Sequence, residues 1–107
     1  MARQEIINEI KGKTASFDAK SYNGFLAVQV TLRDSDEPFY VEIKDGKLSV
    51  EPYEYNDRQA NMLVSSMNFT KMINKKLSIA MAVTREQLTI EGDTEKAREL
   101  IEIIKAS

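Results

Sequence analysis

The sequence predicts an α+β domain, because helical and strand periodicities occupy separate blocks of one short chain. The chain has 107 residues, which suits one ordinary domain spanning 1–107. Apolar residues alternate with period two in several segments, and they recur at i, i+3 and i+4 in others. The expected order of elements is therefore α-β-β-β-β-α-(α)-β-α.

A helix and then a strand are expected at the start of the chain. Ile6, Ile7 and Ile10 fall at helical spacing, and Gly12 can end this helix. The strand covers residues 25–34, where four apolar residues alternate with their neighbours: Leu26, Val28, Val30 and Leu32. This alternation predicts one clearly apolar face.

The next two strands are expected to form a hairpin. Residues 39–44 alternate in the same way, and 47–51 form the third strand before Pro52 ends it. Asp45 and Gly46 lie between the two runs. This dipeptide is favoured where both central residues of a two-residue turn need positive φ, so an antiparallel pair follows.

A crossing segment, a strand and two helices follow. The polar residues 52–59 cross to a fourth strand at 60–66, and Ser66 can cap the next helix. One side of the strand presents Ala60, Met62 and Val64, and one face of the helix presents Phe69, Met72 and Ile73. A second short helix is expected over the apolar residues Ile79, Met81, Ala82 and Val83.

The chain is expected to finish with a strand and an amphipathic helix. Residues 87–92 return to period two, and Asp93 is a good N-cap for a helix over 94–106. The buried stripe of that helix should contain Ala97, Leu100, Ile101 and Ile104.

The composition removes several classes of function. The chain contains no histidine and no cysteine, so it lacks the usual general base, the usual metal ligands and the strongest nucleophile. We therefore expect no enzymatic activity, no metal and no cofactor. The net charge of −2 and the pI near 5.2 come from interspersed charges and indicate no nucleic-acid partner.

No targeting or membrane-spanning pattern is evident in the sequence. The first residues, MARQEIINEIKGK, lack an apolar core of signal-peptide length, and no stretch approaches the ~20 apolar residues of a membrane span. The absence of cysteine fits a reducing compartment. We expect a cytoplasmic protein without stable membrane insertion.

Two further features have competing interpretations. Asp34, Asp36 and Glu37 form an acidic loop, for which a solvated turn is favoured over a cation site. Four methionines lie close together, namely Met62, Met67, Met72 and Met81. Unbranched thioethers suit a promiscuous apolar site, although a methionine stripe at helical spacing more often belongs to an ordinary core.

Three blocks of sequence carry a family resemblance. They are FYVEIKDGKLSV, ANMLVSSMNFTKMI and MAVTREQLTIEGDTEKARELIEII, in which Leu88, Ile90, Gly92, Asp93 and Ala97 fall on a strand, turn and helix pattern. On these residues, the stretch 39–104 resembles the sterol carrier protein family, also called non-specific lipid-transfer domains. The chain departs from the family at Lys75 and Glu86, where glycine is usual, and at Val83, where phenylalanine is common.

The resemblance implies a five-stranded, mostly antiparallel sheet covered on one face by helices, with a hydrophobic tunnel between the layers. The first strand would lie beside the fourth. The implied function is non-covalent binding or transfer of a lipid-like ligand (fatty acid, acyl-CoA, isoprenoid or sterol) by a monomer or weak homodimer. The expected pocket residues are Met62, Val64, Phe69, Met72, Ile73, Ile79, Met81, Val83, Leu100, Ile101 and Ile104. The alternative is a protein-interaction or accessory module that keeps the fold with a filled tunnel.

Overall fold

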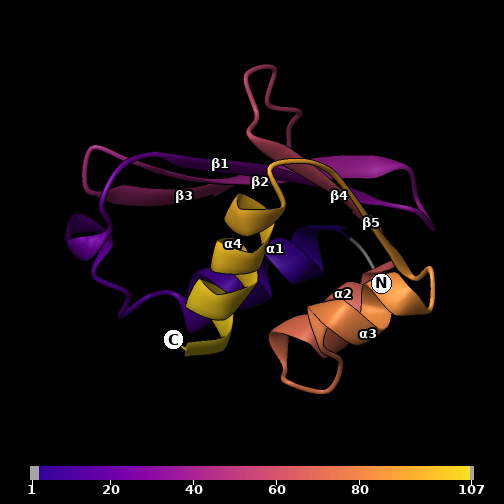
Figure 1. Cartoon of the computed structure of the whole chain (residues 1–107). Helices are drawn as coiled ribbons and strands as arrows, with labels where there is room; N and C mark the ends of the chain where they lie inside the picture. Colours follow the sequence, from indigo (N-terminus) through magenta and orange to yellow (C-terminus); the bar gives the residue numbers. More distant parts are fainter. Residues whose placement is uncertain (1–2, 107) are drawn as a thin grey trace.

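Five strands form one sheet in the order β3-β2-β1-β4-β5, in a computed structural model that describes residues 3–106 (Figure 1). The strands are β1 (Leu26–Leu32), β2 (Glu37–Lys44), β3 (Lys47–Glu51), β4 (Ala60–Val64) and β5 (Leu88–Gly92). β1 pairs in parallel with β4, and the other three neighbouring pairs are antiparallel. The predicted α+β class, the mostly antiparallel sheet and the pairing of the first with the fourth strand are confirmed.

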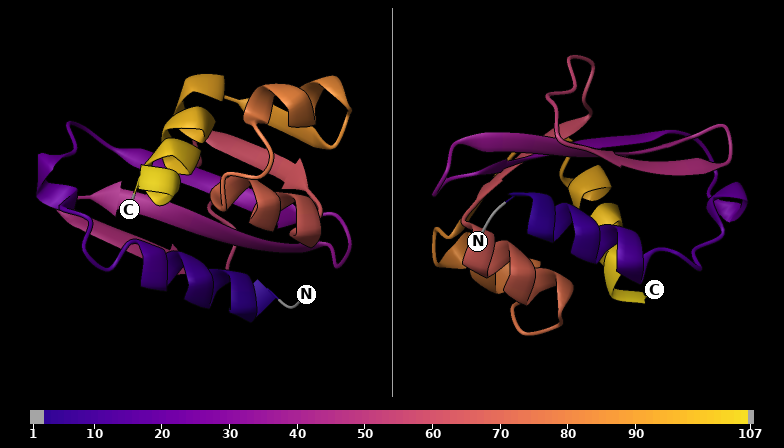
Figure 2. Two further views of the ribbon diagram at one scale, coloured as in Figure 1. Left: turned by 90° about the horizontal axis from the view of Figure 1, so that it is seen from below. Right: turned by 180° about the vertical axis from the view of Figure 1, so that it is seen from behind.

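The α-helices all lie on one face of the sheet, as Figure 2 shows from below and from behind. They are α1 (Arg3–Lys13), α2 (Ser66–Ile73), α3 (Ile79–Thr84) and α4 (Thr94–Ala106); a short 3₁₀ helix, η1 (Ala19–Ser21), precedes β1. α1 packs on β2 and β3, while α4 crosses β1, β4 and β5. α3 contacts β5 at the sheet edge. Within residues 3–106, no helix has the length and apolarity required to cross a bilayer.

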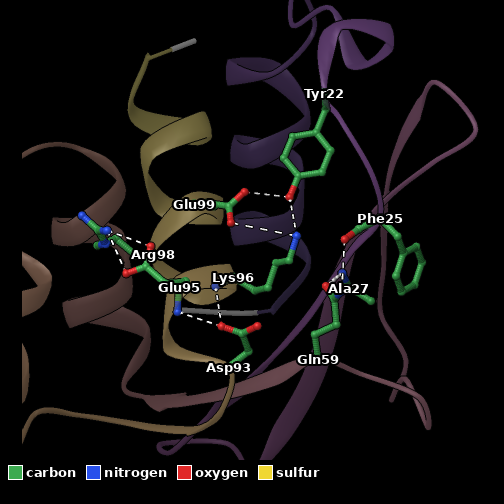
Figure 3. Close-up of polar contacts among 9 residues, drawn as sticks. All are labelled: Tyr22, Phe25, Ala27, Gln59, Asp93, Glu95, Lys96, Arg98 and Glu99. Carbon is green, nitrogen blue, oxygen red and sulfur yellow. Dashed lines mark hydrogen bonds and ion pairs between the residues drawn. The ribbon is translucent and has the colours of Figure 1, made fainter.

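The crossing segment, residues 52–59, lies on the opposite face of the sheet from the helices (Figure 1). Gln59 fixes this segment to β1: its Oε1 accepts from the backbone N of Ala27 at 2.8 Å, and its Nε2 donates to the carbonyl of Phe25 at 3.1 Å (Figure 3). The side-chain bonds hold the end of the segment in line with β1. β4 therefore continues as a parallel neighbour of β1.

The turn between β2 and β3 has the backbone that its residues predict. Asp45 and Gly46 have φ angles of 53° and 77°, and Lys44 pairs with Lys47 across the turn. Both central residues are thus in the left-handed region that a tight two-residue hairpin requires. The hairpin prediction is confirmed.

Two predicted helix boundaries are wrong by a single residue. α1 continues through Gly12 to Lys13, and the cap of α2 is Ser65, whose hydroxyl accepts from the backbone N of Asn68 at 3.2 Å. Ser66 is instead buried, and its N and Oγ both donate to Oδ1 of Asp34, at 2.9 and 3.1 Å. These hydrogen bonds connect the β1–β2 loop to the start of α2. They also lower the pKa of Asp34, because they stabilise its charged form.

Lys75 and Glu86 adopt the left-handed backbone that glycine prefers. Their φ angles are 63° and 60°, and each follows the end of a helix, α2 or α3. These are the two positions at which the chain departs from the glycines of the sterol carrier pattern. The left-handed turns are therefore retained, at a cost of roughly 1–2 kcal/mol for each side chain that has a Cβ atom.

Asp93 caps α4 as predicted, since its Oδ1 accepts from the backbone N of Glu95 at 3.0 Å and of Lys96 at 3.3 Å (Figure 3). We expect Asp93→Ala to lower the free energy of unfolding by about 1 kcal/mol, because two backbone donors lose their acceptor. Urea titration measures the change. Asp93→Asn, which keeps the acceptor, should cost much less; equal losses would show that the carboxylate charge, rather than capping, stabilises this helix.

Candidate functional site

Eight of the eleven predicted pocket residues meet between the sheet and the helices. They come from β4, α2 and α4 and are Met62, Val64, Phe69, Met72, Ile73, Leu100, Ile101 and Ile104. Each is at most 1% exposed, and all belong to one continuous hydrophobic cluster. These eight residues are called the apolar layer below. The apolar periodicity of β4, α2 and α4 therefore identified side chains that are buried in the same hydrophobic cluster.

Side chains pack closely in the apolar layer. Phe69 of α2 contacts Phe39 of β2 edge to face, with ring centroids 5.7 Å apart and planes at 81°. Both rings are fully buried. Met62 and Met72 lie in the same cluster, and their unbranched side chains change shape at little cost.

The other three predicted residues lie outside the apolar layer. Ile79 is only partly buried, while Met81 and Val83 are 43% and 46% exposed. The reason is the position of α3 at the edge of the sheet, where only Ala82 is buried. The four clustered methionines accordingly divide into two buried residues and two exposed ones, since Met67 is also 65% exposed.

A hollow of about 650 Å³ opens between the end of α1, η1 and the β2–β3 hairpin. Its charged lining consists of Lys11, Lys20, Lys47, Asp18 and Glu51, and its apolar lining includes Phe17 and Val50. Val50 is only 2% exposed and belongs to the same hydrophobic cluster as the apolar layer. This hollow therefore joins a surface of mixed charge, in which lysines outnumber carboxylates by three to two, to the core.

Two further hollows, of about 380 and 500 Å³, lie between the segment before β1 and α4. Both share Phe17 with the first hollow and have Ile103 of α4 as an apolar wall. Phe17 thus stands where three hollows meet. Sequence reasoning did not include it, and the available signal was an aromatic residue within an otherwise polar and small segment.

A hydrogen-bonded group, drawn in Figure 3, contributes Tyr22 and Glu99 to the wall of the hollow of about 380 Å³. Tyr22 donates its hydroxyl proton to Oε1 of Glu99 at 2.7 Å and accepts from Nζ of Lys96 at 3.0 Å. Burial raises the pKa of Tyr22, the bond from Lys96 lowers it, and the bond to Glu99 raises it again. The bond to Tyr22 raises the pKa of Lys96. The group connects α4 to the segment before β1.

The face of the sheet away from the helices carries a second polar group. Tyr55 of the crossing segment donates to Oε2 of Glu42 at 2.6 Å, and its backbone N donates to Oε1 of Gln29 at 3.0 Å. The bond to Glu42 raises the pKa of Tyr55 to about 12. Tyr40 packs edge to face on Tyr55, with ring centroids 4.9 Å apart. These contacts hold the crossing segment against this face of the sheet.

Comparison with known proteins supports a single family. The model of the SCP-2 sterol transfer family matches residues 3–105. Comparison with curated proteins yields no significant sequence match.

Solved structures share the fold at low identity. The palmitated SCP2L2 protein of Aedes aegypti is 20% identical with a TM-score of 0.67, covering 97% of this chain and 95% of that one. The UbiJ-SCP2 ubiquinone synthesis protein is 10% identical with a TM-score of 0.77 and coverages of 97% and 96%. The sec-alkylsulfatase Pisa1 of a Pseudomonas species is 11% identical with a TM-score of 0.68; the match covers 91% of this chain but spans only 14% of the sulfatase.

Proposed function

The chain belongs to the SCP-2 sterol transfer family, and from this premise we propose that it binds a lipid-like apolar ligand non-covalently and releases it unchanged. Domains of this family commonly bind or transfer lipid. The ligand would be held by burial of its hydrocarbon part, with no covalent step. The transfer free energy of roughly 0.8 kcal/mol per buried CH₂ group supplies the affinity.

The observation that carries this proposal is the junction between the hollows and the apolar layer. Val50 lines the hollow of about 650 Å³ and belongs to the buried cluster, while Phe17 and Ile103 pack against the cluster from outside. A hydrocarbon chain would pass Phe17 and enter the layer between sheet and helices. Met62 and Met72 would move to accommodate it. The remaining predicted residues of the layer would form the walls.

Three of the five charged residues around the hollow of about 650 Å³ are lysines, and this positive balance favours an anionic head group. Lys11, Lys20 and Lys47 line this hollow from α1, η1 and β3. A carboxylate or phosphate lying among them would form charge-assisted hydrogen bonds, which a sterol hydroxyl cannot match. The related Aedes aegypti structure is of a palmitated protein, which supports the same class. Fatty acids and acyl-CoA are therefore proposed ahead of isoprenoids and sterols.

Extraction of the purified protein with organic solvent, followed by mass spectrometry, should recover a single-chain anionic lipid. Lys20→Gln/Lys47→Gln should lower its recovery because the head group loses two cationic partners. Arg58→Gln/Arg85→Gln makes the same change in net charge at exposed residues that do not line this hollow, and should leave recovery unchanged. Equal recovery from both double variants would contradict the proposed position of the head group.

A protein-interaction or accessory module is the second candidate. The tight packing of the apolar layer favours it, since eight residues there are at most 1% exposed. The occurrence of this fold within a much longer sulfatase chain is consistent with an accessory use of the domain. Absence of any co-purified lipid, together with no thermal response to added lipid, would favour this candidate.

A further inference from the structure

The charges of this chain are strongly segregated along the sequence, contrary to the even distribution expected from the whole-chain values. Residues 58–85 contain five of the 15 basic residues and none of the 17 acidic ones. This stretch therefore carries +5, while the remainder carries −7. The five cations are Arg58, Lys71, Lys75, Lys76 and Arg85.

The same stretch exposes most of the large apolar side chains that reach the surface. Met67, Met81 and Val83 are 65%, 43% and 46% exposed, and the other large exposed hydrophobic residue in the described part of the chain is Tyr53. α3 contains no charged residue and buries only Ala82. Its outward side is therefore apolar, which is unusual for a helix at the surface of a globular domain.

The loop that joins α2 to α3 lies at the outer side of the helical layer, away from the sheet, at the bottom of Figure 1. Lys75 and Lys76 are exposed within this loop, and Lys71 is exposed on α2. Within residues 3–106, no ion pair connects these lysines or Arg85 to a carboxylate. No direct ion pair therefore neutralises these four cations, although the carboxylate of Glu9 accepts from Asn74 of the same stretch at 2.8 Å.

We propose that residues 65–85 form a docking surface for the face of an anionic lipid bilayer. The lysines of α2 and its following loop would contact the phosphate groups of the lipids. Met67, Met81 and Val83 would enter the boundary between head groups and acyl chains, as the apolar side of an interfacial helix does. The acidic remainder of the chain would be repelled from the membrane, so the molecule would bind in one orientation and reversibly.

Vesicle flotation tests the electrostatic half of this proposal. The protein should float with vesicles of phosphatidylcholine mixed with phosphatidylglycerol, and not with phosphatidylcholine alone. Lys71→Gln/Lys75→Gln/Lys76→Gln should weaken this partitioning by about 100-fold, since each lysine near an anionic surface contributes roughly fivefold. The matched control, Lys13→Gln/Lys44→Gln/Lys105→Gln, has the same net charge and should retain binding to within a fewfold.

Fluorescence tests the apolar half, because the chain contains no tryptophan. Met81→Trp should shift its emission to the blue on addition of the mixed vesicles. Tyr53→Trp places the same probe on the crossing segment, at a residue that is 63% exposed on the other face of the sheet, and should show no shift (Figure 1).

Three results would overturn the proposal: no flotation with the mixed vesicles, equal loss in the two triple variants, or equal emission shifts at positions 81 and 53. A concentration-dependent dimer that Met81→Glu dissolves would also overturn it, by assigning the surface to a second copy of the chain. This proposal and the proposed lipid pocket can fail independently. Lipid recovery from the purified protein tests the pocket without vesicles, whereas flotation and fluorescence test the docking surface.

Discussion

Delipidated protein should melt at least about 10 °C higher in the presence of its matching lipid. A ligand at ~100 times its dissociation constant, binding only the folded state, adds about 2.7 kcal/mol of stability. For a domain near 100 residues, each kcal/mol raises the melting temperature by roughly 4–8 °C. Differential scanning fluorimetry with fatty acids, acyl-CoA, isoprenoids and sterols would measure the shift.

Two variants separate the apolar layer from the surface in this experiment. Met72→Gln places an amide group in the apolar layer, where burying it without a hydrogen bond costs free energy. This variant should lose most of the lipid-induced shift in melting temperature. Lys44→Gln changes an exposed residue and should leave the shift unchanged. Each shift is taken relative to the ligand-free melting of the same variant. No shift with any of the four lipid classes would reject lipid binding in favour of the interaction module.

Phe69→Ala should lower the free energy of unfolding by about 3–5 kcal/mol. The ring is fully buried between α2 and the sheet, so its removal loses transfer free energy and leaves a cavity. The edge-to-face contact with Phe39 contributes roughly 0.5–1.5 kcal/mol of this total. Guanidinium titration of the variant measures the loss.

The exposed residue Met67 on the same helix provides the control. Met67→Ala should change stability by less than about 0.5 kcal/mol, because the side chain is 65% exposed. A double-mutant cycle of Phe39→Leu and Phe69→Leu would isolate the ring contact. A loss below about 1 kcal/mol for Phe69→Ala would show that the apolar layer collapses easily around a missing ring.

Local periodicity was sufficient to predict most of the fold. Alternation in residues 26–32 identified β1 and its buried face, and Asp45 with Gly46 identified the β2–β3 turn. The stripes on α2 and α4 identified the helix faces that pack on the sheet. Each of these signals lies within a few residues of the backbone it determines, and burial of a continuous apolar face makes the alternative orientation costly.

The candidate site was predicted only in part. The spacing of the eight residues of the apolar layer was enough to predict that they are buried, because a buried stripe must face the core wherever the core lies. Ile79, Met81 and Val83 fit the same apolar pattern, yet α3 lies at the sheet edge and buries only Ala82. The hollows around Phe17 depend on segments distant in sequence, such as α4 and β3, and no local pattern marked them.

The sequence by itself determined the order of the elements, their buried faces and the turn chemistry, because these follow from side-chain spacing and backbone preference over short distances. The tertiary structure alone decided which apolar residues remain exposed, where the hollows open and how the crossing segment is held. Gln59 shows the physical reason: its bonds to Phe25 and Ala27 connect residues more than 30 positions apart. Such contacts exist only once the sheet has brought both partners together.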